Sequence, residues 1–329
     1  MIDTLRGWLS HYWVLLPAKV LAVLLIFLVV PLLVGYMEHK VMAHMQARVG
    51  PMEAGRFHGV LQLVADGIKF VQKEAIVPRA ADKWVFALAP AVALIPGILV
   101  FGFIPYGRHL VPIRSDVGLF VTLALSSVSV IGVLMAAWAS NNKYSLIGGL
   151  RAAAQLIAYE LPLVLAAAAV AMQAQSADLA RIVEQQHWWG WGGWGLLLWL
   201  GFFVYGTAAL AELVRPPFDM PVADSELVFG YLTEYTGLRF AFFLLTEYAG
   251  IVSQSAIAAT LFLGGWHGPL LDGPWWLAAK VLGLSFLVIW FRATYPRLRE
   301  DQLQRFAWAS LVPLSLLLIL VIGFTKVVI

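Results

Sequence analysis

The sequence predicts an all-α, polytopic integral membrane protein with about eight transmembrane helices and one long cytoplasmic loop that carries an amphipathic helix. The first observation is composition: the mean hydropathy is +0.82, and the 329 residues are 61% hydrophobic and only 12% charged. Soluble domains are not this apolar. The second observation is a series of apolar segments, each long enough for a bilayer core that needs about 20 helical residues. They are 15–37, 85–105, 116–139, 154–174, 193–213, 239–264, 275–292 and 309–328.

The connections between these segments predict a single membrane domain, 1–329, with a defined orientation. Of the 22 Lys and Arg residues, 15 lie in or at the edges of four alternate connections: 37–83, 140–153, 214–238 and 292–308. The positive-inside rule places these four in the cytoplasm and both termini on the periplasmic side of a bacterial inner membrane. Trp188, Trp189, Trp275 and Trp276 are typical of an aromatic belt at the outer boundary.

The longest connection is predicted to contain a helix that lies along the membrane surface. In 57–74 the apolar residues Val60, Val64, Ile68 and Val71 recur at helical spacing, with charged residues on the other side. This pattern predicts an amphipathic helix in the cytoplasmic interface. The alternative is a surface helix without a specific role.

The chain contains no cysteine, which excludes disulfides and iron–sulfur clusters held by thiolates. The seven histidines form no pair that would suggest a haem. We therefore expect no metal and no cofactor bound by this chain alone, and no catalytic residue in it. Lipids are expected partners, whereas nucleic acids are not.

Ionisable side chains within apolar segments are costly, and they are functional candidates for that reason. Glu160 and Glu247 lie inside two predicted helices, and Glu212 closes a third. Bases are scarce inside the bilayer, which predicts that Glu160 and Glu247 are unpaired and carry protons. Tyr159 and Tyr248 neighbour these acids and are placed to pass protons on. The alternative is structural: each acid pairs with a base or a backbone group and fastens two helices together.

Acids also gather beside two consecutive prolines in the segment AELVRPPFDMPVADSELVFGYLTEYTG, 211–237. Pro216 and Pro217 cannot donate backbone hydrogen bonds, so they end the fifth helix. The non-helical loop that follows is predicted to approach the membrane again. Such backbone is tolerated at depth where it is buried in protein or lines a wet cavity.

Four motifs in these connections together resemble those of a known family. They are EHK…QARVGP…GVLQLVADGIKFVQKE (38–74), WASNNKYSLIGGLRAAAQLIAYELP (138–162), AELVRPPFDMPVADSELVFGYLTEY (211–235) and FRATYPRLREDQL (291–303). The chain resembles the quinone-chamber membrane subunits, those of the H type, of proton-pumping NADH:quinone oxidoreductase, respiratory complex I. The match covers almost the whole chain.

The resemblance implies a subunit that docks beneath a hydrophilic arm and forms part of a chamber for ubiquinone or menaquinone as substrate. Iron–sulfur clusters and FMN are then expected in partner subunits, and further membrane subunits are expected beside the chain. The resemblance assigns to the quinone chamber and its outlet Glu38, Arg48, Asp66, Lys69, Arg151, Arg215, Asp219, Asp224 and Glu226. It assigns Glu160, Glu212 and Glu247 to a proton path, beside Tyr159 and Tyr248.

This chain departs from the family pattern at several positions. Ser127 and Val222 stand where the family usually has acids, and Asp224 replaces the usual glutamate. Two other functions stay open at this point. One is the membrane-anchor subunit of a related membrane-bound hydrogenase-type complex, and the other is a secondary transporter. The 214–238 loop and the amphipathic segment favour the quinone enzyme, and the absence of a repeated half argues against a transporter.

Overall fold

The structure is a computed structural model that describes residues 12–192 and 195–328, and within these residues it is helical without strands. The long helices are α2 (Tyr12–Met45), α4 (Lys83–Phe103), α5 (Gly118–Ala139), α6 (Lys143–Ala174), α8 (Gly195–Glu212), α10 (Gly237–Phe262), α11 (Pro274–Thr294) and α13 (Val312–Val328). The short ones are α3 (Gln62–Gln72), α7 (Leu179–Glu184), α9 (Asp224–Leu227), η1 (Gly230–Leu232), α12 (Glu300–Phe306) and η2 (Ala307–Leu311).

The predicted class, an all-α polytopic membrane protein, is confirmed. In the described part, 7 helices are long and apolar enough to cross a membrane, and Leu197–Glu212 of α8 is a shorter apolar helix. Two helices extend beyond their predicted ends: α2 continues to Met45, and α6 begins at Lys143 rather than near residue 154. Charged residues such as Glu38 and Arg151 therefore lie on helices. The sequence pattern missed this because hydropathy marks the apolar part of a helix and not its full length.

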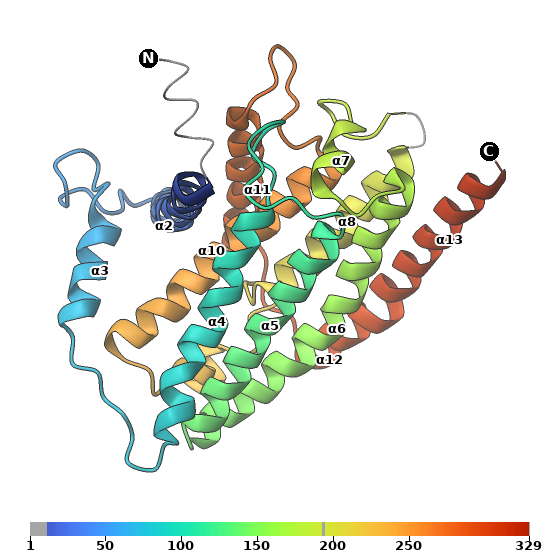
Figure 1. The fold of residues 1–329 in the computed structure, drawn as a ribbon. Coiled ribbons are helices and arrows are strands. Elements are labelled where there is room, and N and C mark those ends of the chain that lie inside the picture. The colour runs from blue at the N-terminus through green and yellow to red at the C-terminus, as the bar shows by residue number, and fades with distance from the viewer. Residues whose placement is uncertain (1–11, 193–194, 329) are drawn as a thin grey trace, which may run out of the picture.

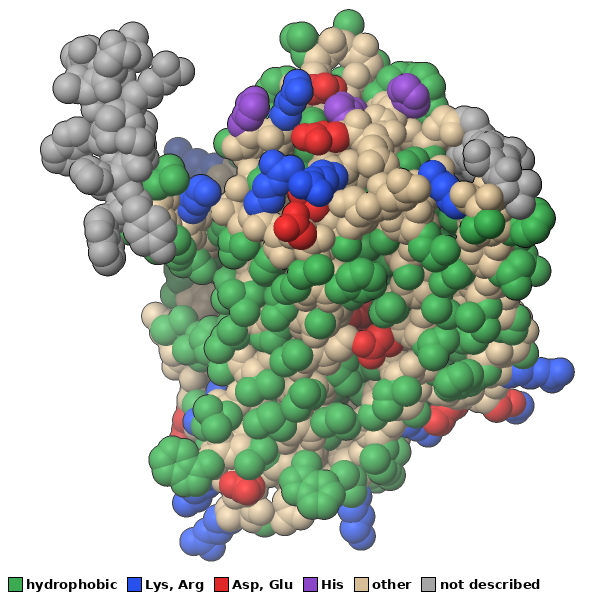
Figure 2. Space-filling model, turned by 45° about the vertical axis from the view of Figure 1, so that its right-hand side comes forward, with side chains coloured by type: hydrophobic (Ala, Val, Ile, Leu, Met, Phe, Trp, Pro, Cys, Tyr) green, Lys and Arg blue, Asp and Glu red, His purple; other side chains and the backbone are tan. Residues whose placement is uncertain are grey.

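The helices form an elongated bundle in which α4, α5 and α6 lie side by side (Figure 1). Helix α10 contacts α2, α4 and α11, and α6 contacts α8 and α13. Small residues allow the close crossings that are common between membrane helices. At the crossing of α4 and α5, a Cβ on Gly132 would lie 2.5 Å from the Ala93 nitrogen. On the face seen in Figure 2, the middle is largely apolar apart from one acidic patch, and the other charged side chains gather at the two ends.

One end of the bundle, called here the loop end, carries the connections after α2, α5, α8 and α11. The predicted amphipathic helix is present as α3, whose Phe70 ring lies 5.7 Å from that of Phe240 on α10. Val64, Ile68 and Val71, on another side of α3, are exposed. Helix α3 therefore packs on the bundle with one side and leaves an apolar side uncovered by this chain.

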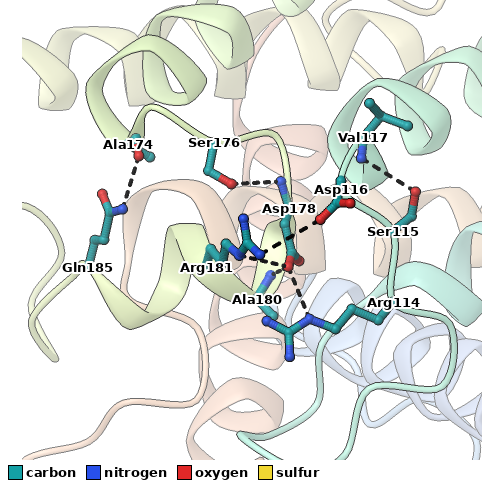
Figure 3. Close-up of polar contacts among 10 residues, drawn as sticks. All are labelled: Arg114, Ser115, Asp116, Val117, Ala174, Ser176, Asp178, Ala180, Arg181 and Gln185. Atoms are coloured by element: carbon teal, nitrogen blue, oxygen red, sulfur yellow. Dashed lines mark hydrogen bonds and ion pairs between the residues drawn. The ribbon is translucent and has the colours of Figure 1, made fainter.

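The opposite end is fastened by an ionic cluster around Asp178, which Figure 3 shows. Asp178 is almost fully buried and caps α7 by accepting a hydrogen bond of 2.9 Å from the Ala180 N–H. Its Oδ2 lies 3.1 Å from Nε of Arg114 and 3.8 Å from Nε of Arg181. These contacts join the loop before α5 to α7, so this end of the bundle is held by its own side chains.

Candidate functional site

A cavity of about 290 Å³ lies in the half of the bundle nearer the loop end, where the loop after α8 meets α4, α5 and α10. Its wall contains acids, bases and hydroxyls among apolar residues. The polar lining groups include Ser126, Ser129, Glu212, Arg215, Asp219, Tyr231, Glu247, Tyr248, Gln254 and Arg292. Irregular backbone is tolerated at depth where it is buried in protein or lines a wet cavity, and here residues of the loop line a cavity.

The loop forms one wall because α8 stops before the prolines. The helix ends at Glu212, and Val214 has a positive φ of 52° that turns the chain out of the helical path. Pro216 and Pro217 lack the N–H groups that a further turn would need. The chain then doubles back through α9 and η1 before α10 begins. Leu213 through Asp219 thus supply irregular backbone that is buried in protein, the condition under which such backbone is stable at depth.

A buried glutamine fixes this loop against α6. The Gln155 side-chain amide donates to the Ala211 carbonyl at the end of α8 and to the Phe218 carbonyl in the loop, both at 2.7 Å. Gly230 allows two parts of the loop to lie close together: its φ is +54°, and a Cβ there would lie 1.9 Å from the Pro221 oxygen. The loop position is therefore set by α6 and by one residue without a side chain.

Arg215 is the centre of the first polar group in the site. It is only 3% exposed, and its Nη1 donates to both carboxylate oxygens of Glu38, at 3.0 and 3.1 Å. Its Nε lies 2.8 Å from Oε1 of Glu247 as an ion pair, although the Nε–H does not point at an acceptor among the described residues. Its guanidinium also lies 5.1 Å from the Tyr248 ring centroid.

Arg292, from the end of α11, completes this group by pairing with Glu38. Two acids and two bases from α2, α10, α11 and the loop are thus joined, and their formal charges balance. A buried pair is weakly stabilising as a whole, but removing one partner leaves an uncompensated charge. If one carboxylate of this cluster gains a proton, the charges no longer balance and the ion pairs of that carboxylate are weakened.

Glu212 is the centre of a second polar group in the cavity lining. Its carboxylate accepts a hydrogen bond of 2.9 Å from the Gln254 amide, whose oxygen accepts one of 2.7 Å from the Tyr205 hydroxyl. Ser126 on α5 lines the same cavity. The Ser127 hydroxyl donates to the Glu160 carboxylate, which links α5 to α6. Acids on α6, α8 and α10 are therefore arranged from the surface of the bundle to the cavity wall.

At the loop end, Arg151 on α6 contacts acids in two connections, one after α8 and one after α11. Its Nη1 lies 2.5 Å from Oε2 of Glu226, and its Nε lies 3.4 Å from Oε2 of Glu300. The hydrogen bond from Arg151 holds the pKa of Glu226 below its ordinary value. The Arg297 guanidinium donates to the Asp219 carbonyl at 2.8 Å. These contacts connect α6, the 213–236 loop and α12 outside the cavity.

The structure brings some of the predicted site residues together and separates others. Lining the cavity are Glu212, Arg215, Asp219, Glu247 and Tyr248, and Glu38 lies beside it through Arg215. Outside its lining are Arg48, Asp66, Lys69, Arg151, Tyr159, Glu160 and Glu226. Asp224 begins α9, but its side chain lies outside the part that the structure describes.

Three of these separated residues have local partners. Arg48 donates to Gln46 at 2.8 Å, and Asp66 pairs with Lys69 on α3 at 3.5 Å. Both contacts join residues within a few positions of each other, so they do not fix one element against another. Their exposed positions leave Arg48 and Lys69 available to a molecule at the loop end.

One sequence prediction about charge is wrong. Glu247 is not unpaired, because Arg215 approaches it from the loop. The prediction counted bases within the apolar segments, whereas this base comes from a loop that folds back into the bundle. Glu160 has no cation partner among the described residues, and its contact is Ser127. Tyr159 turns away from the cavity and donates to the Leu303 carbonyl at 2.9 Å.

Sequence reasoning missed Arg292, Gln155, Gln254 and Ser126. Gln254 follows Glu247 by seven residues, so helical periodicity places both on one face of α10. That spacing was a usable signal. Arg292 was visible as a base at the end of a spanning helix, but nothing in the sequence pairs it with Glu38.

The site contains several groups that can exchange protons and no metal-binding constellation. Carboxylates, hydroxyls and an amide line one partly open cavity. In the described residues, no group of three His, Asp or Glu side chains is arranged to hold a metal ion. The arrangement therefore suits proton transfer and charge rearrangement.

Known proteins are similar to this chain over almost its whole length. Residues 18–323 match a family described as NADH dehydrogenase. The chain is 43% identical to an H-type subunit of the NADH-quinone oxidoreductase of Geobacter sulfurreducens, over 95% of both chains. It is 46% identical to the H-type subunit of the same enzyme from Dehalococcoides mccartyi, over 96% of this chain and 88% of the relative. It is 44% identical to the corresponding protein from Geobacillus kaustophilus, over 94% and 93% respectively.

Proposed function

The chain belongs to the NADH dehydrogenase family that includes the H-type membrane subunits of NADH-quinone oxidoreductase, and from this premise we propose how it acts in that enzyme. It is a membrane subunit of a proton-translocating NADH:quinone oxidoreductase. It forms part of the quinone-binding chamber and couples quinone reduction to proton translocation. The observation that carries the proposal is the cavity lined by Glu212 and by Arg215, which contacts Glu38 and Glu247.

The roles proposed for the residues are those that the family resemblance implies, and the contacts in the cavity support the roles of Arg215, Glu38 and Glu247. Glu38, Arg48, Asp66, Lys69, Arg151, Asp219, Asp224 and Glu226 belong to the chamber and its outlet. In this group Arg215 positions the carboxylates of Glu38 and Glu247. Protonation changes then pass to the path of Glu247, Glu212 and Glu160, with Ser127 hydrogen-bonded to the last of these.

Coupling is a matter of charge balance in this proposal. Reduction of a quinone to a quinol consumes two electrons and two protons, so groups near the headgroup change protonation when it is reduced. Loss of a proton from the chamber changes the field at Arg215, whose guanidinium is buried and cannot itself deprotonate. The change in protonation therefore occurs at the carboxylates that Arg215 contacts, Glu38 and Glu247.

The chain acts within a larger assembly. Electrons come from iron–sulfur clusters and FMN in partner subunits, since NADH oxidation needs centres that this chain does not supply. The hydrophilic-arm subunits cover the loop end, and other membrane subunits and lipids surround the apolar band. The loop end faces the cytoplasm of a bacterial cell, and both termini lie on the periplasmic side of its inner membrane, as the distribution of Lys and Arg indicates.

Photolabelling tests the chamber assignment in the assembled enzyme. A quinone carrying a photoreactive group is irradiated with membranes that contain the complex, and labelled peptides of this chain are identified by mass spectrometry. We expect labelling in 38–74 or 214–237, reduced by an excess of unlabelled quinone. Labelling confined to the opposite-end connections, 104–117 and 263–273, would refute the assignment.

A further inference from the structure

A second hollow lies on the outside of the bundle, away from the polar cavity. It is an apolar groove of about 420 Å³ between the loop-end turns of α4, α5 and α6. Apart from Ala137 and Gly149, its lining consists of large apolar side chains: Val85, Leu134, Met135, Trp138, Leu146 and Leu150. An apolar groove on the membrane-facing side of a spanning bundle matches the chemistry of a hydrocarbon chain.

Basic side chains mark the end of this groove. Lys143, Leu146 and Leu150 are spaced at i, i+3 and i+7, so one face of α6 carries a base at its first turn and groove residues after it. Lys83 begins α4 on the other side of the groove. Both lysines are exposed, and neither forms an ion pair with a described residue. A phosphate at the groove end therefore meets free ammonium groups.

The adjoining loop brings one more base and one acid to the same end. The Asp82 N–H donates to the Ala139 carbonyl at 3.1 Å, and the Asn141 amide donates to the Ala80 carbonyl at 3.2 Å. These bonds hold residues 78–82 against the end of α5, so Arg79 and Asp82 lie at the same end as the two lysines.

A second acid approaches from the loop before α10, but it is already engaged. The Glu234 carboxylate accepts a hydrogen bond of 2.6 Å from the Asn142 amide, next to Lys143. Three bases, namely Arg79, Lys83 and Lys143, therefore face two acids, and the net local charge is positive. Figure 2 shows charged side chains gathered at both ends of the apolar face.

Aromatic side chains and helix ends at the groove also favour a lipid with an anionic headgroup. Trp138 is 74% exposed and Trp84 is 82% exposed, and tryptophan is favoured at the boundary between hydrocarbon and headgroups. Helices α4 and α6 both begin here, so their N-terminal dipoles favour an anion. For α4, no side chain caps the first N–H groups.

We propose that this groove binds an anionic phospholipid, with an acyl chain against Leu146 and Leu150 and the phosphate between Lys143 and Lys83. The inference does not depend on the quinone chamber, which lies inside the bundle. It assigns a lipid of stated charge to one place on the surface, beyond general contact with the membrane. Basic pockets between helices at the cytoplasmic side are a known way of holding such headgroups.

Two matched lipid probes test the proposal on the complete enzyme in lipid nanodiscs. One is phosphatidylglycerol and the other phosphatidylcholine, with the same photoreactive acyl chain, and crosslinked peptides are mapped by mass spectrometry. We expect phosphatidylglycerol to label 134–150 more strongly than phosphatidylcholine does. In Lys143→Gln and in Lys83→Gln, this labelling should fall about fivefold, from about 1 kcal/mol per basic side chain. Lys73→Gln, an exposed base beyond α3, should leave it unchanged.

Two results would overturn the proposal. Equal labelling of 134–150 by both probes, insensitive to Lys143→Gln, would mean a general membrane contact without headgroup selection. The other result uses the absence of cysteine, since Leu150→Cys introduces a single thiol into this chain. A thiol-directed photocrosslinker on Leu150→Cys that captures another subunit in place of lipid would mean that protein covers the groove.

Discussion

At the scale of single residues, Arg215 determines whether the site holds together. Its guanidinium is almost fully buried and contacts both Glu38 and Glu247. The planar fork of arginine can hydrogen-bond one carboxylate and form an ion pair with a second one, which a lysine ammonium does with less defined geometry. The sequence leaves two roles open for Glu160, Glu212 and Glu247: fastening helices by pairing with a base or a backbone group, or carrying protons. For Glu247 the pairing is compatible with both roles, because this acid also lines the cavity.

Replacing Arg215→Met should destabilise the subunit strongly. The change leaves Glu247 without its cation, and removing one partner of a buried ion pair costs about 3–5 kcal/mol. We expect less of the assembled complex in membranes and a lower thermal unfolding temperature. Arg215→Lys should recover part of both. Unchanged assembly in Arg215→Met would contradict the central position given to this side chain.

Tyr159 illustrates the opposite case, a residue whose neighbour in sequence suggested a role in proton transfer. Its hydroxyl donates to the Leu303 carbonyl, and its ring contacts Phe218 edge to face at 5.4 Å. Tyr159→Phe should therefore lower stability by about 1 kcal/mol, the net value of one hydrogen bond, and leave proton pumping nearly unchanged. Proton pumping measured in inverted vesicles checks this. A large loss of pumping in Tyr159→Phe would contradict the prediction and would mean that Tyr159 takes part in proton transfer.

At the scale of elements, the contact between α6 and the loop after α8 shapes the cavity wall. Gln155 is buried and bonded to two carbonyls, one at the end of α8 and one beyond the prolines. The loop has no regular hydrogen-bond pattern of its own over Arg215–Ala223, so it depends on such side-chain donors. We therefore expect the position of the loop to depend on the Gln155 side-chain amide.

Gln155→Leu should loosen the loop while the helices stay in place. Two buried carbonyls lose a donor, which costs about 2 kcal/mol, and leucine fills a similar volume. We expect faster amide hydrogen exchange in 213–223 of the assembled enzyme, measured by mass spectrometry. Gln185→Leu is a matched control, because Gln185 donates one comparable bond of 2.9 Å at the opposite end of the bundle. Equal effects of the two variants on 213–223 would rule out the assigned role of Gln155.

At the scale of the whole molecule, hydropathy and charge distribution were sufficient to predict the class and every long helix. The amphipathic α3 also followed from spacing alone. Helix ends were less predictable, since Glu38 and Arg151 lie on helical turns that continue past the apolar part of α2 and α6. Local composition cannot reveal such continuation, because packing against neighbouring elements stabilises those turns.

Some members of the site were predictable, but the contacts between them were not. Motif resemblance and the cost of buried charge selected Glu212, Arg215 and Glu247, which line one cavity. The pairing of Arg215 with Glu38 spans 177 positions in the sequence and depends on how the loop folds back. No single-sequence pattern encodes that approach. The resemblance to complex I agreed with the relatives, whose names favour the quinone enzyme over a hydrogenase anchor or a transporter.

The central claim is that Glu247, held by Arg215 at the cavity wall, carries protonation changes from the chamber to the membrane path. The most direct test is the proton-pumping rate during NADH oxidation by Glu247→Gln in inverted membrane vesicles, with assembly checked by native gel electrophoresis. Loss of a positioned proton-transfer group typically costs about a hundredfold, so pumping should fall by that order while the complex still assembles. Glu184→Gln, an exposed acid on α7, should pump normally. Full pumping in assembled Glu247→Gln would contradict the account.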